Sequence, residues 1–213
     1  YILILAFAKY KGDAILQKSY TVDFLTKKRA MNQGEIQKFY IEDDHEALIE
    51  PWIWECVQLE IQRRKKYLEE HGTNSYSHNT ESNPFASKIV CGLCNKVFTR
   101  KGWQSRRGEV RKVWQCSERY KVKGVLGCGN RHVEESTLEK AFVMAWNAVL
   151  ENKEYFWQKW EEQKKSENLL EAYRGMDFQN IVEDAKPLKK METDFMLWVL
   201  DHIKVFEDGT LMV

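Results

Sequence analysis

Four of the five cysteines in this chain fall between residues 91 and 128. Cys91 and Cys94 form a CxxC pair, Cys116 follows after 21 residues, and Cys128 after another 11. A turn of this kind places two thiolates at adjacent corners of a tetrahedron, with Zn–S distances of about 2.3 Å. Because four thiolates close the coordination sphere, the spacing predicts one structural zinc ion and no catalytic metal.

Other roles for these thiols remain open at the level of spacing alone, because the second pair is not a CxxC. A disulfide framework and unligated thiols are the alternatives, and His132 could replace Cys128 as a ligand. The apolar start, Tyr1 to Ala8, carries no basic region or cleavage site, which argues against a signal peptide and favours a reducing compartment. Cys56 lies within a predicted helix and is interpreted as a core residue.

A strongly basic block coincides with the cysteines. Residues 88–131 contain 12 Lys or Arg and 2 acidic residues, whereas the flanking segments, 1–87 and 132–213, both carry net negative charge. Solubility alone is served by mixed charges, so an excess of one sign favours a polyanionic partner. We predict DNA contacts from one hairpin: Arg100, Lys101, Trp103, Arg106, Arg107, Arg111 and Lys112. Trp103 could contact the sugar backbone or brace the hairpin.

The elements around this block can be placed by periodicity. Residues 12–42 read as short strands and turns, and they contain a second basic cluster of predicted DNA contacts, Lys27, Lys28 and Arg29. Pro51 predicts the first turn of a helix. The Ser-, Asn- and Gly-rich residues 72–84 read as a linker. The predicted domains are therefore residues 1–71 and 85–213.

Helical periodicity returns after the cysteines, over residues 137–200. Gly175 is expected to end one helix, and another is expected from Pro187 to Leu200. Asp208-Gly209 between two apolar runs predicts a terminal hairpin over 203–213.

Longer motifs in the chain resemble the large serine recombinases. The resemblance covers about residues 9–150 and is carried by the segments Gly12–Arg29, Tyr40–Pro51, Asn83–Cys94, Trp114–Cys116 and Glu134–Phe142. It implies an α+β chain: a small mixed α/β recombinase (DNA-binding) domain followed by a zinc β-ribbon domain with long helices. A coiled-coil insertion through which subunits of this family meet would fall on residues 151–186, and ordinary helices packed on their own domain are the alternative. It also implies that the amino-terminal catalytic domain of the family lies outside this sequence, so no residue is assigned a catalytic role.

The function implied by the resemblance is site-specific DNA binding in the integration or excision of a bacterial mobile element. The expected partners are a double-stranded DNA attachment site and other copies of the parent protein, a serine site-specific recombinase of the cytoplasm associated with the nucleoid. No apolar run reaches the ~18 residues of a membrane span. The alternatives are a zinc-ribbon protein–protein interaction module and another zinc-ribbon nucleic-acid-binding factor.

Overall fold

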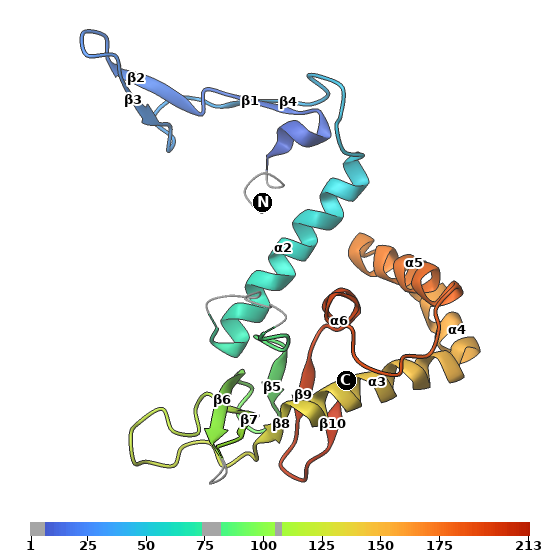
Figure 1. Cartoon of the computed structure of the whole chain (residues 1–213). Helices are drawn as coiled ribbons and strands as arrows, with labels where there is room; N and C mark the ends of the chain where they lie inside the picture. The colour runs from blue at the N-terminus through green and yellow to red at the C-terminus, as the bar shows by residue number, and fades with distance from the viewer. Residues whose placement is uncertain (1–6, 74–81, 105–107) are drawn as a thin grey trace. The chain divides into compact units, whose positions relative to one another are not determined.

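The computed structural model describes residues 7–73, 82–104 and 108–213 as helices joined to small sheets (Figure 1). This mixture confirms the predicted α+β class. The chain divides into two compact units, residues 1–62 with 166–173 and residues 63–165 with 174–213. Helix α2 (Pro51–His71) begins at the predicted proline and contributes to both units.

The first unit is built from short antiparallel pairs, as the predicted strands and turns over 12–42 require. Strand β1 pairs with β4, and β2 pairs with β3. The elements are the 3-10 helix η1 (Ala8–Lys11) and strands β1 (Ala14–Leu16), β2 (Ser19–Asp23), β3 (Lys28–Met31) and β4 (Phe39–Ile41). Gln17 has a φ of 58° and lies between β1 and β2, where the chain leaves the extended conformation.

Two buried polar side chains hold these pairs together. The Asn32 amide donates to Gln17 O at 2.8 Å and to Ile36 O at 2.6 Å, and its Oδ1 accepts from Gly34 N and Ile36 N. Asp13 accepts from Tyr40 Oη and from Asp43 N, and it forms an ion pair of 2.7 Å with Lys11. Each side chain bonds to several segments at once, so each fixes the ends of the strands in register.

The second unit contains two three-stranded sheets. One has the antiparallel order β6 (Phe98–Gln104), β7 (Val110–Cys116), β8 (Val133–Glu134). In the other, β9 (Ile203–Val205) lies between β10 (Leu211–Met212) and β5 (Ile89–Cys91). The β9–β10 pair confirms the predicted terminal hairpin. The parallel pairing of β9 with β5 was not predicted, and it places β9 beside the strand that ends at Cys91 (Figure 1).

Most of the apolar core lies in this second unit. One cluster surrounds the sheets and the face of α3, and a smaller one lies among the helices. The larger cluster includes Phe85, Ile89, Trp114, Leu138, Phe142, Met196 and Ile203. Burying a side chain of this size stabilises the fold by about 1.5–3 kcal/mol, so this cluster fixes the sheets against α3.

The helical stretch predicted over 137–200 consists of several shorter helices: α3 (Glu135–Glu151), α4 (Lys153–Gln163), α5 (Leu169–Glu183) and α6 (Thr193–Val199). The expectation that Gly175 ends a helix is wrong, because Gly175 lies inside α5. A Cβ at this position would stand 2.8 Å from Trp160 O. The glycine therefore serves the close approach of two helices, with Trp160 and Phe178 stacked at 5.6 Å beside it.

The helix predicted from Pro187 to Leu200 is also shorter than expected, since it begins only at Thr193. Leu188 is held outside any helix by Asn147, whose Oδ1 accepts from Leu188 N at 2.8 Å and whose Nδ2 donates to Leu188 O at 3.0 Å. An amide side chain that bonds both backbone groups of one residue replaces the bonds that a helix would make.

The predicted linker over 72–84 falls largely on residues 74–81, which lie outside the described residues, as do residues 1–6. The division at residues 71 and 85 stays a prediction. In the described ranges, no helix is long and apolar enough to cross a lipid bilayer.

Candidate metal centre and nucleic-acid interface

The four predicted ligands come together in space. The sulfur atoms of Cys91, Cys94, Cys116 and Cys128 all lie within 4.8 Å of one another. Cys91 Sγ is 3.6 Å from Cys128 Sγ, and Cys94 Sγ is 3.3 Å from Cys116 Sγ. A tetrahedron with Zn–S bonds of about 2.3 Å has sulfur atoms about 3.8 Å apart. The cluster therefore has the size and the soft, all-thiolate chemistry of a structural zinc site.

Two turns present these sulfur atoms. Cys91 ends β5, and the turn after it closes through Cys91 N to Lys96 O and Asn95 N to Cys91 O, both at 2.9 Å. Gly92 lies on this turn because β9 passes close by: its N–H donates to Val205 O at 2.7 Å, and a Cβ there would meet the same oxygen at 2.8 Å. Cys116 ends β7, and Cys128 N donates to Glu118 O to bring the last ligand back.

A residue that the sequence reasoning missed supports the cluster from behind. Asn130 is fully buried, and its Nδ2 donates to Cys91 Sγ at 3.1 Å and to Val205 O at 2.8 Å. A donor to a ligating sulfur fixes its orientation and stabilises its charge. Asn130 thus links the first ligand to strand β9. Its position two residues after Cys128 was the one signal available in the sequence.

The surroundings of the sulfur atoms shift their pKa values in opposite directions. Burial raises the pKa of the Cys116 and Cys128 thiols. Burial also acts on Cys91, but the bond from Asn130 and nearby backbone N–H groups outweigh it and lower the pKa to about 7. Cys91 therefore ionises more readily than Cys116 or Cys128. A metal ion that bound here would displace protons from those two thiols.

The remaining cysteine and histidine candidates are not part of this cluster. Cys56 is buried in the first unit, where its Sγ donates to Leu169 O at 3.5 Å, in agreement with its interpretation as a core residue. His132 is exposed and its ring lies 4.5 Å from that of Trp103, so the alternative in which it replaces Cys128 is wrong.

The predicted basic hairpin exists and is formed by β6 and β7. The register pairs Arg100 with Trp114, Gly102 with Lys112, and Trp103 with Arg111. Because side chains alternate across a strand, Arg100 and Lys112 share one face of this ribbon. Lys101, Trp103 and Arg111 share the other face. Arg106 and Arg107, between the strands, lie outside the described residues.

On the first face, the cationic side chains lie around the buried carboxylate of Glu135. Glu135 opens α3 and is only 6% exposed. Arg100 donates through Nη2 to its Oε1 at 2.7 Å, Trp114 Nε1 donates to its Oε2 at 3.0 Å, and Lys112 Nζ lies 3.7 Å away. Arg100 therefore has a structural role in tying β6 to α3, a role that its sequence context did not indicate.

The second face is the more open of the two. Lys101, Trp103 and Arg111 are exposed there, and Arg111 forms an ion pair with Glu134 of β8. Trp103 is 40% exposed and packs on His132. Its ring thus braces the hairpin while it keeps one side accessible, so bracing and contact with a partner are compatible. Lys101, Arg111 and Lys112 are exposed cations of this ribbon, whereas Arg100 is only partly exposed.

The other predicted cluster lies on the β2–β3 hairpin of the first unit. Lys27 occupies the turn with a φ of 54°, and Lys28 and Arg29 follow on β3, all three exposed. Arg29 Nη2 donates to Ser19 Oγ at 2.8 Å across the hairpin. The three cations therefore project from one narrow, two-stranded element.

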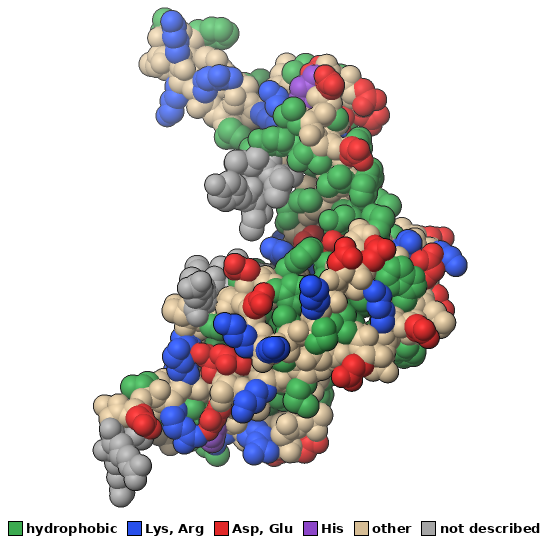
Figure 2. Space-filling model, turned by 45° about the vertical axis from the view of Figure 1, so that its right-hand side comes forward, with side chains coloured by type: hydrophobic (Ala, Val, Ile, Leu, Met, Phe, Trp, Pro, Cys, Tyr) green, Lys and Arg blue, Asp and Glu red, His purple; other side chains and the backbone are tan. Residues whose placement is uncertain are grey.

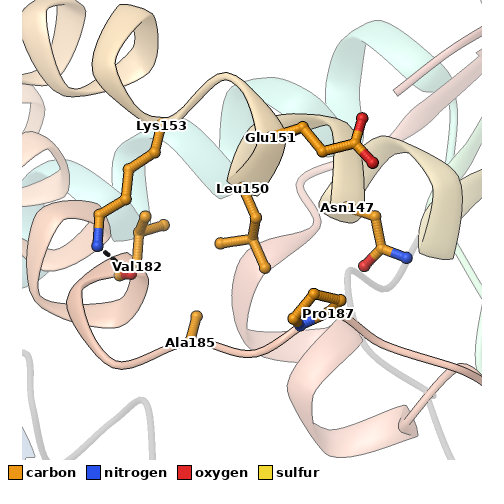
Figure 3. Close-up of a pocket in the computed structure, with 7 residues that line it drawn as sticks. All are labelled: Asn147, Leu150, Glu151, Lys153, Val182, Ala185 and Pro187. Atoms are coloured by element: carbon orange, nitrogen blue, oxygen red, sulfur yellow. Dashed lines mark hydrogen bonds between the residues drawn. The ribbon is translucent and has the colours of Figure 1, made fainter.

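A hollow of about 320 Å³ lies among the helices of the second unit (Figure 3). Its lining residues are Asn147, Leu150, Glu151, Lys153, Val182, Ala185 and Pro187. Lys153 points across it, but its Nζ already donates to Val182 O at 3.0 Å and to Glu183 O at 3.1 Å. The Asn147 amide is bonded to Leu188. These polar groups hold the helices together, and we assign the hollow no chemistry.

Comparison with known proteins identifies the region of the metal centre. Residues 84–147 match the model of the family described as the recombinase zinc beta ribbon domain. This match and the four clustered cysteines confirm the prediction of one structural zinc ion. No curated protein matches the chain.

Two solved structures are similar to larger parts of the chain. One concerns the sequence requirements of the Listeria innocua prophage attP site, with 17% identity, a TM-score of 0.38, and 81% of this chain aligned to 57% of that chain. The other is a complex of a large serine recombinase (LSR) with DNA, with 17% identity, a TM-score of 0.41, and 82% of this chain aligned to 67% of that chain. The chain thus spans little more than half the length of the first.

Proposed function

We propose that this chain, in which residues 84–147 match a recombinase zinc beta ribbon, is a DNA-binding region of a site-specific serine recombinase. It would recognise a double-stranded attachment site of a mobile element. The observation that carries the proposal is the position of the basic hairpin: β6 and β7 extend directly from the cluster of thiols, with Lys101, Arg111 and Lys112 exposed. Zinc in this role is structural and orders the ribbon that meets DNA.

The division of labour within the ribbon follows from its contacts. Arg100 bonds directly to Glu135, and Arg111 pairs closely with Glu134, whereas Lys112 Nζ lies at the longer distance of 3.7 Å from Glu135. Lys101 and Lys112 are the cations we expect to meet phosphates first. Arg106, which lies between β6 and β7 in the sequence, is our candidate for a bidentate contact with guanine, which discriminates between bases by about 1–3 kcal/mol. Arg107 would assist it on the phosphates.

The first unit contributes a second contact through Lys27, Lys28 and Arg29. Two binding elements on one chain raise the affinity for a composite site, because the second contact forms at high effective concentration. In the parent protein, copies bound at two DNA ends would meet through self-association. Strand exchange itself is assigned to no residue of this chain. The expected location is the bacterial nucleoid.

Enrichment of duplexes from a random pool, followed by affinity measurements at several salt concentrations, tests the proposal. If about six phosphates are neutralised, log K should fall with log salt with a slope near −5. Lys101→Ala with Lys112→Ala should reduce that slope by about two units. The matched control, Lys189→Ala with Lys190→Ala, removes two exposed cations outside the ribbon and should leave the slope unchanged. A chain that enriches no duplex and binds none at low salt would refute the proposal.

A further inference from the structure

The tip of the β2–β3 hairpin combines two kinds of side chain that a solvated turn rarely exposes together. Phe24 is 88% exposed and Leu25 is 94% exposed, in adjacent positions. The cations Lys27, Lys28 and Arg29 follow immediately and are also exposed. Figure 2 shows hydrophobic and cationic side chains together at the end of this hairpin. Two adjacent, almost fully exposed large apolar side chains cost solvation free energy, so they indicate a contact surface.

The turn that carries these residues is held in one shape. The Asp23 carboxylate accepts from Leu25 N at 2.9 Å, from Thr26 N at 3.3 Å and from Thr26 Oγ1 at 2.6 Å. These bonds hold the pKa of Asp23 below its usual range, so the carboxylate stays charged and keeps the turn closed at neutral pH. The apolar pair is therefore presented outward by a preorganised turn.

The same bonds remove the polar groups of the tip from any partner. Asp23 is the one acidic residue between positions 19 and 29, and its carboxylate is occupied within the turn. The Thr26 hydroxyl donates to that carboxylate. What remains exposed is apolar surface bordered by positive charge. This combination suits duplex DNA, in which phosphates border each groove and apolar base faces become accessible when a base step is opened.

We infer that this tip is an apolar wedge that enters a groove of duplex DNA and unstacks a base step through Phe24 and Leu25. The inference rests on the proposed function. It adds recognition of DNA sequence through the ease with which a base step is deformed. Apolar side chains inserted between base pairs kink the duplex and generate preference for flexible steps without hydrogen bonds to base edges. Lys27 and Lys28 anchor the hairpin on the flanking phosphates.

The test uses the 213-residue chain and the enriched duplex, with 2-aminopurine placed at each position in turn. Its fluorescence rises when the base loses its stacking neighbours. Wild-type protein should produce a rise at one or two adjacent positions. Phe24→Ala with Leu25→Ala should abolish the rise and weaken binding by about tenfold, as loss of one stacking contact does. Leu48→Ala, which removes another exposed apolar side chain of the first unit (78% exposed), should change neither.

Two further measurements distinguish base unstacking by the apolar pair from phosphate binding by the lysines, and DNA binding from binding to other partners. Lys27→Ala with Lys28→Ala should lower the salt slope by about two units while the fluorescence rise persists at saturating protein. A saturated wild-type complex with no rise at any position would overturn the wedge and leave the proposed function standing. So would binding of the tip to phosphatidylserine vesicles with no unstacking of DNA. Absence of all duplex binding would overturn both.

Discussion

The two basic hairpins, β6–β7 and β2–β3, carry similar charges but are supported by different kinds of structure. The β6–β7 ribbon stands on four clustered cysteines, a buried Glu135 and the larger apolar cluster. The unit that carries the β2–β3 hairpin is ordered by the polar side chains Asp13 and Asn32, and few of its described apolar residues are buried. A small unit with little apolar surface to bury must gain its order from bonds of this kind. The comparison predicts that the two hairpins lose their folded structure under different conditions.

Removal of zinc should produce the largest and most selective effect. A structural zinc site contributes about 10–16 kcal/mol in isolated small domains. Chelation, or Cys116→Ser, should therefore unfold residues 88–131 and leave the pairing of β1 to β4 intact. Amide hydrogen exchange before and after chelation measures both regions in one experiment. Elemental analysis should give one zinc per chain, and purified protein without zinc would contradict the assignment.

Loss of the buried Glu135 carboxylate should produce the second largest effect, a decrease in stability. Glu135→Ala leaves the Arg100 guanidinium and the Trp114 indole N–H without their acceptor. Removing one member of a buried charged pair destabilises a fold by about 3 kcal/mol. Thermal denaturation should show the loss for this variant and not for Glu139→Ala, a neighbour on α3. Equal stability of the two variants would mean that Glu135 does not join the ribbon to its helix.

The buried asparagine of the metal centre should have a smaller effect, expressed mainly in metal affinity. Asn130→Ala removes the donor to Cys91 Sγ and the bond to Val205 O. Loss of such a supporting residue costs about 10–100-fold in metal affinity. Competition with a chromogenic chelator measures this, and the Co²⁺–thiolate charge-transfer band reports the geometry. Unchanged zinc affinity and an unchanged Co²⁺ spectrum would limit Asn130 to packing.

Local patterns in the sequence were sufficient for the features that depend on local chemistry. The spacing of Cys91 and Cys94, the start of α2 at Pro51 and the terminal hairpin all follow from neighbouring residues. The parallel pairing of β5 with β9 could not be predicted, because it joins segments more than 100 residues apart and neither carries a signal for the other. The prediction that Gly175 ends a helix was wrong for a related reason. The sequence does not distinguish a glycine that ends a helix from one that allows another helix to approach closely.

The polar side chains that order the first unit should make its stability depend on pH through the carboxylate of Asp13. Lys11 and Tyr40, which bond to Asp13, hold the pKa of its carboxyl below the usual value. A carboxylate whose pKa is lowered by folding stabilises the fold above its ordinary pKa, and this contribution disappears as the pH falls through the lowered pKa. Asp13→Asn should therefore destabilise the first unit at pH 7, and the difference from wild type should shrink toward pH 3. Asp44→Asn, at an exposed position, serves as the control.

Hydrogen exchange of β1 and β4 at each pH measures this effect separately from the second unit. If the difference between Asp13→Asn and wild type is the same at pH 7 and pH 3, the charge of Asp13 is not what orders these strands. The asparagine variant keeps the shape of the side chain and one acceptor oxygen, so the pH-dependent part of its effect isolates the ion pair with Lys11. Because that pair and the Tyr40 bond meet on a single carboxylate, its loss should loosen β4 together with β1, and the two strands should gain exchange at equal rates.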